Sequence, residues 1–197
     1  FRQALRALRG LPRTLTDALS HIQAAELDLD LTGTLYPDLV EAHDYWQRLR
    51  GNRFAPRRQE VDPADIPKLL PRVMLAEVEH RGEAEVDFRF RLSGTGICRV
   101  HGMDLKGLLA RELEPRAFGH LVHSHYEEAL SRRAPMVHAL AMQSHDAYFS
   151  YARIILPLSD DGSRIDQLLV VDSEKQNSLH EFLQVIEAVG DQPGSAL

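Results

Sequence analysis

The sequence predicts an α+β fold in which helices pack on one face of a five-stranded antiparallel sheet. The spacing of apolar residues changes from a helical period to alternation near residue 73, and five strand-like segments lie beyond this point. Short turn-type sequences separate most of these segments, as between antiparallel neighbours. The chain has 197 residues, of which 44% are hydrophobic and 26% charged, which is typical of one globular domain with extensions.

Helical patterns are expected before the first strand. Apolar residues recur at helical spacing in residues 1–10, in residues 14–26 and in residues 38–51, where Trp46 lies on the apolar face and Gly51 ends the pattern. These three patterns predict three helices that precede the sheet.

A short helix and a hairpin follow. Asp62, placed before Pro63, is a favourable helix N-cap, and Pro71 closes the short helix. Residues 73–80 and 86–92 alternate in polarity and are separated by the turn-like sequence RGEAE, which predicts an antiparallel hairpin. In the second strand Phe88, Phe90 and Leu92 face the interior by alternation, while Arg89 and Arg91 face the other way, so we expect one face of this strand to be solvated.

The second half of the chain completes the sheet. A helix is expected over residues 118–134, because Pro135 disfavours its continuation. Three more strands are expected over residues 136–144, 148–158 and 165–171. The chain is therefore divided into a helical extension (1–37), an α+β domain (38–175), and a C-terminal amphipathic helix with a disordered tail (176–197).

The stretch RLSGTGICRVHGMDLKG is rich in glycine, which raises the question of a phosphate-binding loop. A dinucleotide fingerprint requires a third glycine three residues after Gly96, where this chain has Arg99. The strand before it alternates in polarity, whereas a parallel strand of a nucleotide fold is apolar on both faces. We therefore interpret Gly94 and Gly96 as sites where the strand bends or bulges, and Gly102 and Gly107 as the ends of a one-turn element.

Several short motifs occur in a fixed order along residues 38–172. They are Tyr45-Trp46, Pro56-Arg57-Arg58, Asp62-Pro63, Arg91-Leu92-Ser93-Gly94-Thr95, Gly102 to Gly107, Tyr126 with Pro135, and Leu156-Pro157-Leu158 with Asp161-Gly162. Together they resemble a family of short PAS sensor proteins that lack an output domain. The resemblance implies a five-stranded antiparallel sheet whose helices enclose a small cavity that many PAS domains use for ligands. It names neither a ligand nor a cofactor.

The helix over 118–134 places His125 on its apolar face, toward the expected cavity. A core histidine bonded to a backbone carbonyl and a polar contact to a ligand both remain open. Candidate cavity residues are Phe90, Cys98, Met103, Val122, His125, Tyr126, His138 and Tyr151. His120 and His123 lie on the opposite side of the helix with Glu127, so the three histidines cannot bind one metal ion and no metal site is expected.

Five arginines surround Phe54 in the sequence QRLRGNRFAPRRQE. We expect Arg53, Arg57 and Arg58 to pair within the chain or to contact an anionic partner. The net charge of −6 argues against a nucleic-acid partner.

The sequence contains no nucleophile elbow or other catalytic motif. We therefore expect a non-catalytic sensory module that binds a small ligand or a protein partner and forms a homodimer through its amphipathic terminal helices. A single cysteine and the lack of an apolar run long enough for a membrane span favour a cytoplasmic location. The alternatives are an enzyme with a cone-shaped α+β cavity, which would use His125 or His138, and an adaptor that binds proteins without a ligand.

Overall fold

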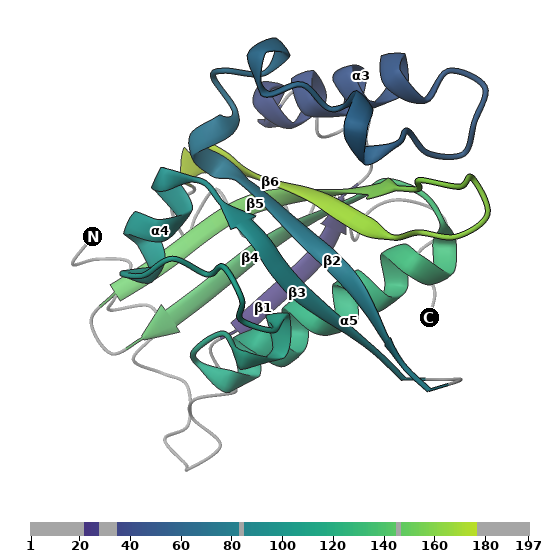
Figure 1. Ribbon diagram of the computed structural model, residues 1–197. Helices are drawn as coiled ribbons and strands as arrows, with labels where there is room; N and C mark the ends of the chain where they lie inside the picture. The colour runs from purple at the N-terminus through teal and green to yellow at the C-terminus, as the bar shows by residue number, and fades with distance from the viewer. Residues whose placement is uncertain (1–21, 28–34, 83–84, 145–146, 177–197) are drawn as a thin grey trace, which may run out of the picture.

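The computed structural model describes residues 22–27, 35–82, 85–144 and 147–176. One six-stranded sheet, antiparallel throughout, forms its centre, with the strand order β1-β4-β5-β6-β2-β3 (Figure 1). The strands are β1 (Ile22–Leu27), β2 (Val73–Arg81), β3 (Glu85–Ser93), β4 (Met136–Ser144), β5 (Ala147–Leu158) and β6 (Gln167–Gln176). The last five correspond to the five predicted strands, so the predicted α+β class and antiparallel sheet are confirmed.

Three α-helices lie within the described residues: α3 (Pro37–Arg50), α4 (Thr95–His101) and α5 (Arg116–Arg132). Four short 3₁₀ turns connect them to the sheet: η3 (Arg58–Glu60), η4 (Pro63–Asp65), η5 (Leu70–Arg72) and η6 (Ala110–Glu112). The oxygen Oδ1 of Asp62 accepts a hydrogen bond from the backbone N–H of Ala64, as expected for a cap. The segment after Asp62 forms separate 3₁₀ turns rather than the predicted short helix.

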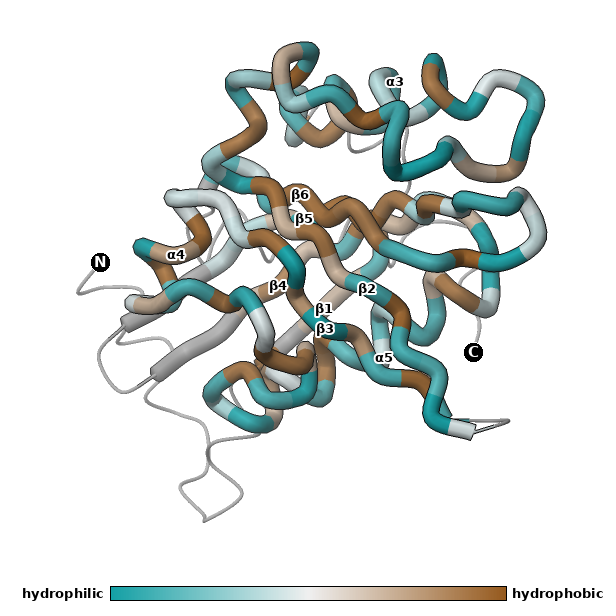
Figure 2. Tube along the Cα trace, viewed as in Figure 1, coloured by the Kyte–Doolittle hydropathy of each residue, from teal (hydrophilic) through white to brown (hydrophobic). Residues whose placement is uncertain are grey.

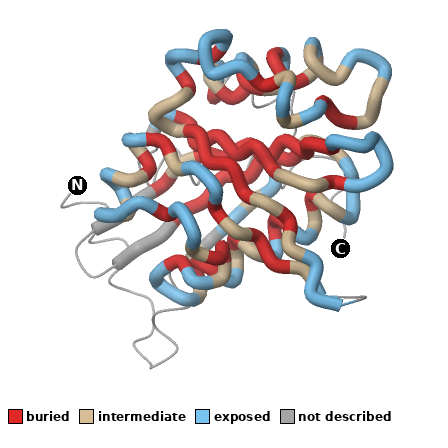
Figure 3. Tube along the Cα trace, viewed as in Figure 1, coloured by how far each residue is buried: buried red, intermediate tan, exposed pale blue. Residues whose placement is uncertain are grey.

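The helices cover both faces of the sheet rather than the single face that we expected. Leu39 and Trp46 of α3 pack with Ile154 of β5, whereas Val122 of α5 packs with Ile155, the next residue of the same strand (Figure 1). Successive side chains of a strand point to opposite faces, so the two helices lie on opposite sides. Residues 154–158 of β5 and 168–171 of β6 are apolar and buried on both faces, which requires a cover on each (Figures 2 and 3).

The prediction of a helix over residues 14–26 is wrong for residues 22–27, which form strand β1. Residues 22–27 pair in register with β4, from Ile22 opposite Met142 to Leu27 opposite Val137. Individual helix preferences are weak, and the unpaired edge of β4 offers backbone partners to this segment. Residues 14–21 of that pattern, the pattern over 1–10, and the C-terminal helix and tail lie outside the described residues.

The glycines of the RLSGTGICRVHGMDLKG stretch are required for two structural reasons, close packing and backbone conformation. A Cβ atom at Gly94 would lie 2.2 Å from the carbonyl oxygen of Leu70, and one at Gly96 would lie 2.8 Å from that of Pro71. Only glycine allows this contact between α4 and η5. Gly102 and Gly107 instead have positive φ angles of 71° and 92°.

The irregularity expected at Gly94 and Gly96 lies earlier in the chain. The pairing of β2 with β3 shifts so that Arg91 has no paired residue opposite it. Beyond such a bulge the alternation of side chains reverses. Leu92, which we expected to face the interior with Phe88 and Phe90, is therefore 43% exposed.

Candidate functional site

A row of polar side chains crosses the sheet on the face that α5 covers. His138 of β4 is in register with Arg153 of β5, which is in register with Asp172 of β6. Glu26 of β1 lies opposite His138 and continues the row to the edge of the sheet. His138, Arg153 and Asp172 are all buried, although charged residues are seldom buried unless they are paired.

Arg153 and Asp172 form a buried ion pair. The guanidinium Nε lies 2.7 Å from Oδ1 of Asp172, and Nη2 donates both to Oδ2 at 3.3 Å and to the hydroxyl of Tyr151 at 3.1 Å. Burial alone would lower the pKa of Arg153, but the Asp172 carboxylate and the neighbouring tyrosines raise it well above its usual value. The guanidinium therefore stays charged inside the protein.

Two donors beside this ion pair have no hydrogen-bond partner among the described residues. They are Nη1 of Arg153 and the hydroxyl of Tyr126, and both side chains are at most 1% exposed. Burial raises the pKa of Tyr126 to about 12, so its hydroxyl keeps its proton. A buried donor without a partner costs about 1–3 kcal/mol, and such groups are rare in folded proteins.

His125 and His138 stack on each other across the interface of α5 with the sheet. Their ring centroids are 3.8 Å apart and the rings are tilted by 7°. Burial lowers the pKa of His125 to about 4, and burial together with His125 and Arg153 lowers the pKa of His138 to about 3. Both imidazoles are therefore neutral near pH 7.

Aromatic rings surround the guanidinium. Its central carbon lies 5.5 Å from the ring centroid of Tyr151 and 6.0 Å from that of Phe118 in α5. The His101 ring, at the C-terminal end of α4, lies 6.3 Å from Phe118, and its pKa is lowered by burial and by Arg153. One helix and three strands thus contribute to one set of polar groups, the Arg153 cluster. It comprises Tyr126, His138, Tyr151, Arg153 and Asp172.

Residues 36–170, more than half of the chain, match a family that is described as a PAS domain. The chain belongs to the PAS domain family. This confirms the resemblance inferred from the sequence motifs, and it indicates a sensory or signalling module in general terms. No curated protein matches the chain. Among the described residues of this PAS domain, no helix is long and apolar enough to cross a membrane.

The PAS domain brings six of the eight predicted cavity residues to the α5 face of the sheet. They are Phe90, Val122, His125, Tyr126, His138 and Tyr151. Met103 does not join them, because its side chain is 52% exposed beyond the end of α4. Cys98 is half-buried, and its Sγ lies 3.3 Å from Oγ of Ser93 on β3. Met103 therefore cannot line an interior site, and Cys98 has a local contact at the start of α4.

Sequence reasoning missed Arg153 and Asp172. A signal was present: Arg153 lies within the apolar strand YFSYARIILPL, two residues before Ile155 and two after Tyr151. Alternation therefore directs Arg153 inward. A charge at an inward position of an apolar strand indicates a buried partner. Asp172, at the end of the run QLLVVD, is that partner.

The predicted arginine segment contacts groups within the PAS domain. Nη2 of Arg53 lies 2.9 Å from Oε2 of Glu60, and the guanidinium of Arg58 donates to the carbonyl of Val61. The backbone N–H of Arg58 donates to Asp160, and Arg57 is exposed on the surface. These contacts account for two of the three side chains, while an anionic partner for the segment stays a prediction.

The two histidines predicted on the outer side of α5 differ, because the ring of His123 packs edge-on against the buried Phe88, with 5.1 Å between the ring centroids. His120 is exposed, and Nε2 of His123 lies 3.5 Å from Oε1 of Glu127, one turn along the helix. The helix turns the predicted residues inward, with Phe118, Val122, His125 and Ala129 buried. In the described part of the chain, no three histidine, cysteine or acidic side chains are grouped as metal ligands.

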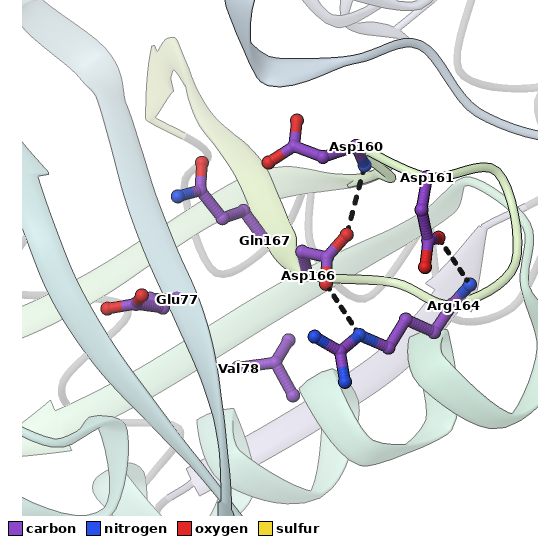
Figure 4. A pocket seen from close by; sticks show the side chains of 7 residues that line it. All are labelled: Glu77, Val78, Asp160, Asp161, Arg164, Asp166 and Gln167. Carbon is purple, nitrogen blue, oxygen red and sulfur yellow. Dashed lines mark hydrogen bonds and ion pairs between the residues drawn. The ribbon is translucent and has the colours of Figure 1, made fainter.

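An acidic pocket of about 330 Å³ lies beside β2 and the turn between β5 and β6 (Figure 4). Its lining residues are Glu77, Val78, Asp160, Asp161, Arg164, Asp166 and Gln167. The turn holds its own carboxylates, because Asp166 accepts from Nε of Arg164 at 2.8 Å and from the backbone N–H of Asp160 at 2.9 Å. Hydrogen bonds from Ser163 lower the pKa of Asp161 to about 2. These contacts give the acidic residues of the turn between β5 and β6 a structural role.

Proposed function

We propose that this PAS domain is a non-catalytic sensory module that binds a small molecule at the Arg153 cluster. The observation that carries the proposal is the pair of buried donors, Nη1 of Arg153 and the Tyr126 hydroxyl, which have no partner among the described residues. A ligand that accepts hydrogen bonds from both groups offsets the cost of burying them. The site lies between α5 and the sheet.

The protonation states at the cluster support binding rather than acid-base catalysis. A general acid or base works best when its pKa lies near the ambient pH. The pKa values of His125 and His138 lie near 4 and 3, and that of Tyr126 lies near 12. Near pH 7 these groups therefore keep one protonation state and serve as fixed hydrogen-bonding partners.

Helix α5 links the cluster to the edge of the sheet. It contributes Tyr126 to the site, and its last turn contains Arg132, whose Nη1 lies 2.5 Å from Oε1 of Glu26 in β1. A ligand that favours one position of α5 therefore changes the contacts at β1, in proportion to its preference for that position. We infer that the signal leaves the domain at β1, in a cytoplasmic homodimer or in a complex with a signalling protein.

Native mass spectrometry of the purified protein tests the proposal. We expect the wild-type protein to retain a small molecule, which Tyr126→Phe loses or holds in a much smaller fraction. Tyr45→Phe is the matched control, because the Tyr45 hydroxyl bonds to the backbone of Asp62 on the opposite face of the sheet. This control should lower stability by about 1 kcal/mol and keep the bound mass. If all three proteins retain the small molecule equally, the site does not include Tyr126. If the wild-type protein retains no small molecule, the result favours the alternative of an adaptor that binds proteins without a ligand.

A further inference from the structure

The Arg153 cluster has no net charge of its own. The charge of Arg153 is balanced by Asp172, at 2.7 Å, while His138 is neutral and Tyr126 keeps its proton near pH 7. Arg72 also acts on Tyr151, but this arginine is half-buried at the margin and is hydrogen-bonded to the carbonyl of Ser173. Arg72 is therefore a neighbour of the cluster, and its charge acts from the margin.

Most of the free hydrogen-bonding capacity of the cluster is on the donor side. Nδ1 of His138 also has no partner among the described residues, and it donates or accepts according to the tautomer of the ring. The Asp172 carboxylate accepts two bonds from Arg153, and the Tyr151 oxygen accepts a third. Nη1 of Arg153 can donate two hydrogen bonds and the Tyr126 hydroxyl one, and neither has an acceptor among the described residues. A ligand must therefore supply acceptor oxygens at this point.

Charge decides between the possible acceptors. A carboxylate or phosphate would accept from both donors, but it would bring an uncompensated negative charge to a buried site where Asp172 already balances the guanidinium. Burying an unpaired charge costs far more than burying a neutral carbonyl that is hydrogen-bonded. The aromatic rings of Phe118 and Tyr151, next to the guanidinium, favour an apolar or aromatic body on the ligand.

Resting on the function proposed above, we infer that the ligand is an uncharged small molecule with a carbonyl-type oxygen. This oxygen accepts hydrogen bonds from Nη1 of Arg153 and from the hydroxyl of Tyr126, and the apolar body of the ligand packs against Phe118 and Tyr151. Asp172 is then a specificity-determining residue. It does not touch the ligand, but its charge makes the site reject anions.

Three probes of nearly equal shape test the inference: benzamide is neutral, benzoate is an anion and benzylamine is a cation. Their dissociation constants can be measured by calorimetry on the full chain at pH 7. We expect wild-type protein to bind benzamide at least tenfold more tightly than benzoate or benzylamine. Asp172→Asn leaves the arginine unbalanced, so it should shift the ratio of benzamide to benzoate affinity at least tenfold toward benzoate.

Tyr126→Phe gives a second readout that does not depend on the ion pair. It removes one donor to the carbonyl and should weaken benzamide binding about fivefold or more. The unliganded variant should be at least as stable as the wild type, because it lacks a buried hydroxyl that has no partner among the described residues. This variant keeps the inference testable even if Asp172→Asn does not fold.

The possible outcomes distinguish a failure of the inferred ligand class from a failure of the proposed function. Tighter binding of benzoate than of benzamide by the wild type overturns the neutral ligand, while the sensory function stands. A retained natural molecule that proves to be an acid has the same consequence. A wild-type protein that retains no molecule and binds none of the probes overturns both the ligand class and the proposed function.

Discussion

Arg153 and Asp172 occupy directly paired positions on β5 and β6, and their side chains meet at 2.7 Å in the interior, where Arg153 is 1% exposed and Asp172 is 7% exposed. Each charge is therefore kept inside the protein by the other. Buried ion pairs add little net stability compared with apolar residues of the same size, but removal of one partner leaves an unpaired buried charge.

The first prediction concerns this ion pair. Asp172→Ala should lower the free energy of unfolding by about 3–5 kcal/mol, because it leaves the guanidinium of Arg153 unpaired. The double variant Arg153→Leu with Asp172→Leu should recover most of that loss, since the same face of the neighbouring strands holds Ile155 and Val170. Urea denaturation measures both changes. If the double variant lost as much free energy of unfolding as the two single variants together, the pairing of Arg153 with Asp172 would be contradicted.

The second prediction concerns the contact of α4 with η5. A methyl group at Gly94 would lie 2.2 Å from the carbonyl oxygen of Leu70, and backbone atoms cannot easily move aside. Gly94→Ala should therefore destabilise the protein by about 3 kcal/mol or more. Gly162→Asn is the control, since its φ of 76° suits asparagine and no atom lies within 4 Å of its added Cβ. A cost below about 1 kcal/mol at Gly94 would show that η5 can move away.

The sequence predicts the sheet well where one face is polar or where a turn is clear. The strand over residues 136–144 is observed with the same bounds, and the inward side of α5, including His125, is as the helical period predicts. In these segments the local sequence pattern and the tertiary packing favour the same secondary structure, so the pattern alone is sufficient for the prediction.

The parts that could not be predicted depend on distant segments. The segment at Ile22 resembles a helix by itself and becomes a strand because the edge of β4 is unpaired. Arg153 and Asp172 are 19 residues apart in the sequence, and only the register of β5 with β6 brings them together. The exposure of Leu92 depends on a bulge that no turn-type residue in the sequence indicates.

The third prediction concerns pH. The pKa of His125 and of His138 is lower in the folded protein, at about 4 and about 3, than the usual 6.5. The unfolded chain therefore binds more protons between these values, and stability should fall as the pH drops below about 6.5. Each histidine should contribute a loss of about 2 kcal/mol between pH 7 and pH 5.

Urea denaturation at pH 7 and at pH 5 measures this loss. Glu60, Glu79 and Asp104 also have lowered pKa values in the folded protein, so they lose their contributions mainly below about pH 4.5. The range from pH 5 to pH 7 therefore isolates the histidines, and His43 and His101, whose pKa values burial also lowers, add smaller contributions there. Replacement of His125 and His138 by leucine should reduce the pH dependence in this range by more than half, and an unchanged dependence would assign it to other groups.

The fourth prediction concerns β1, which lies outside the family match over residues 36–170. All six of its residues pair with β4, and Leu27 is buried at 3% exposure in the α3 side of the core. A chain that begins at residue 28 therefore leaves the edge of β4 without a partner, and such edges pair with other chains. We expect a melting temperature about 5–10 °C lower than that of a chain that begins at residue 22.

The comparison of these two truncated chains isolates β1, because they differ only in residues 22–27. Calorimetry measures the melting temperatures, and light scattering at increasing protein concentration detects association through the exposed edge. Glu26→Gln in the full chain separates the role of the Glu26–Arg132 ion pair, which is exposed to solvent and should contribute less than about 1 kcal/mol. Equal melting temperatures for the two truncated chains would show that β1 adds no stability.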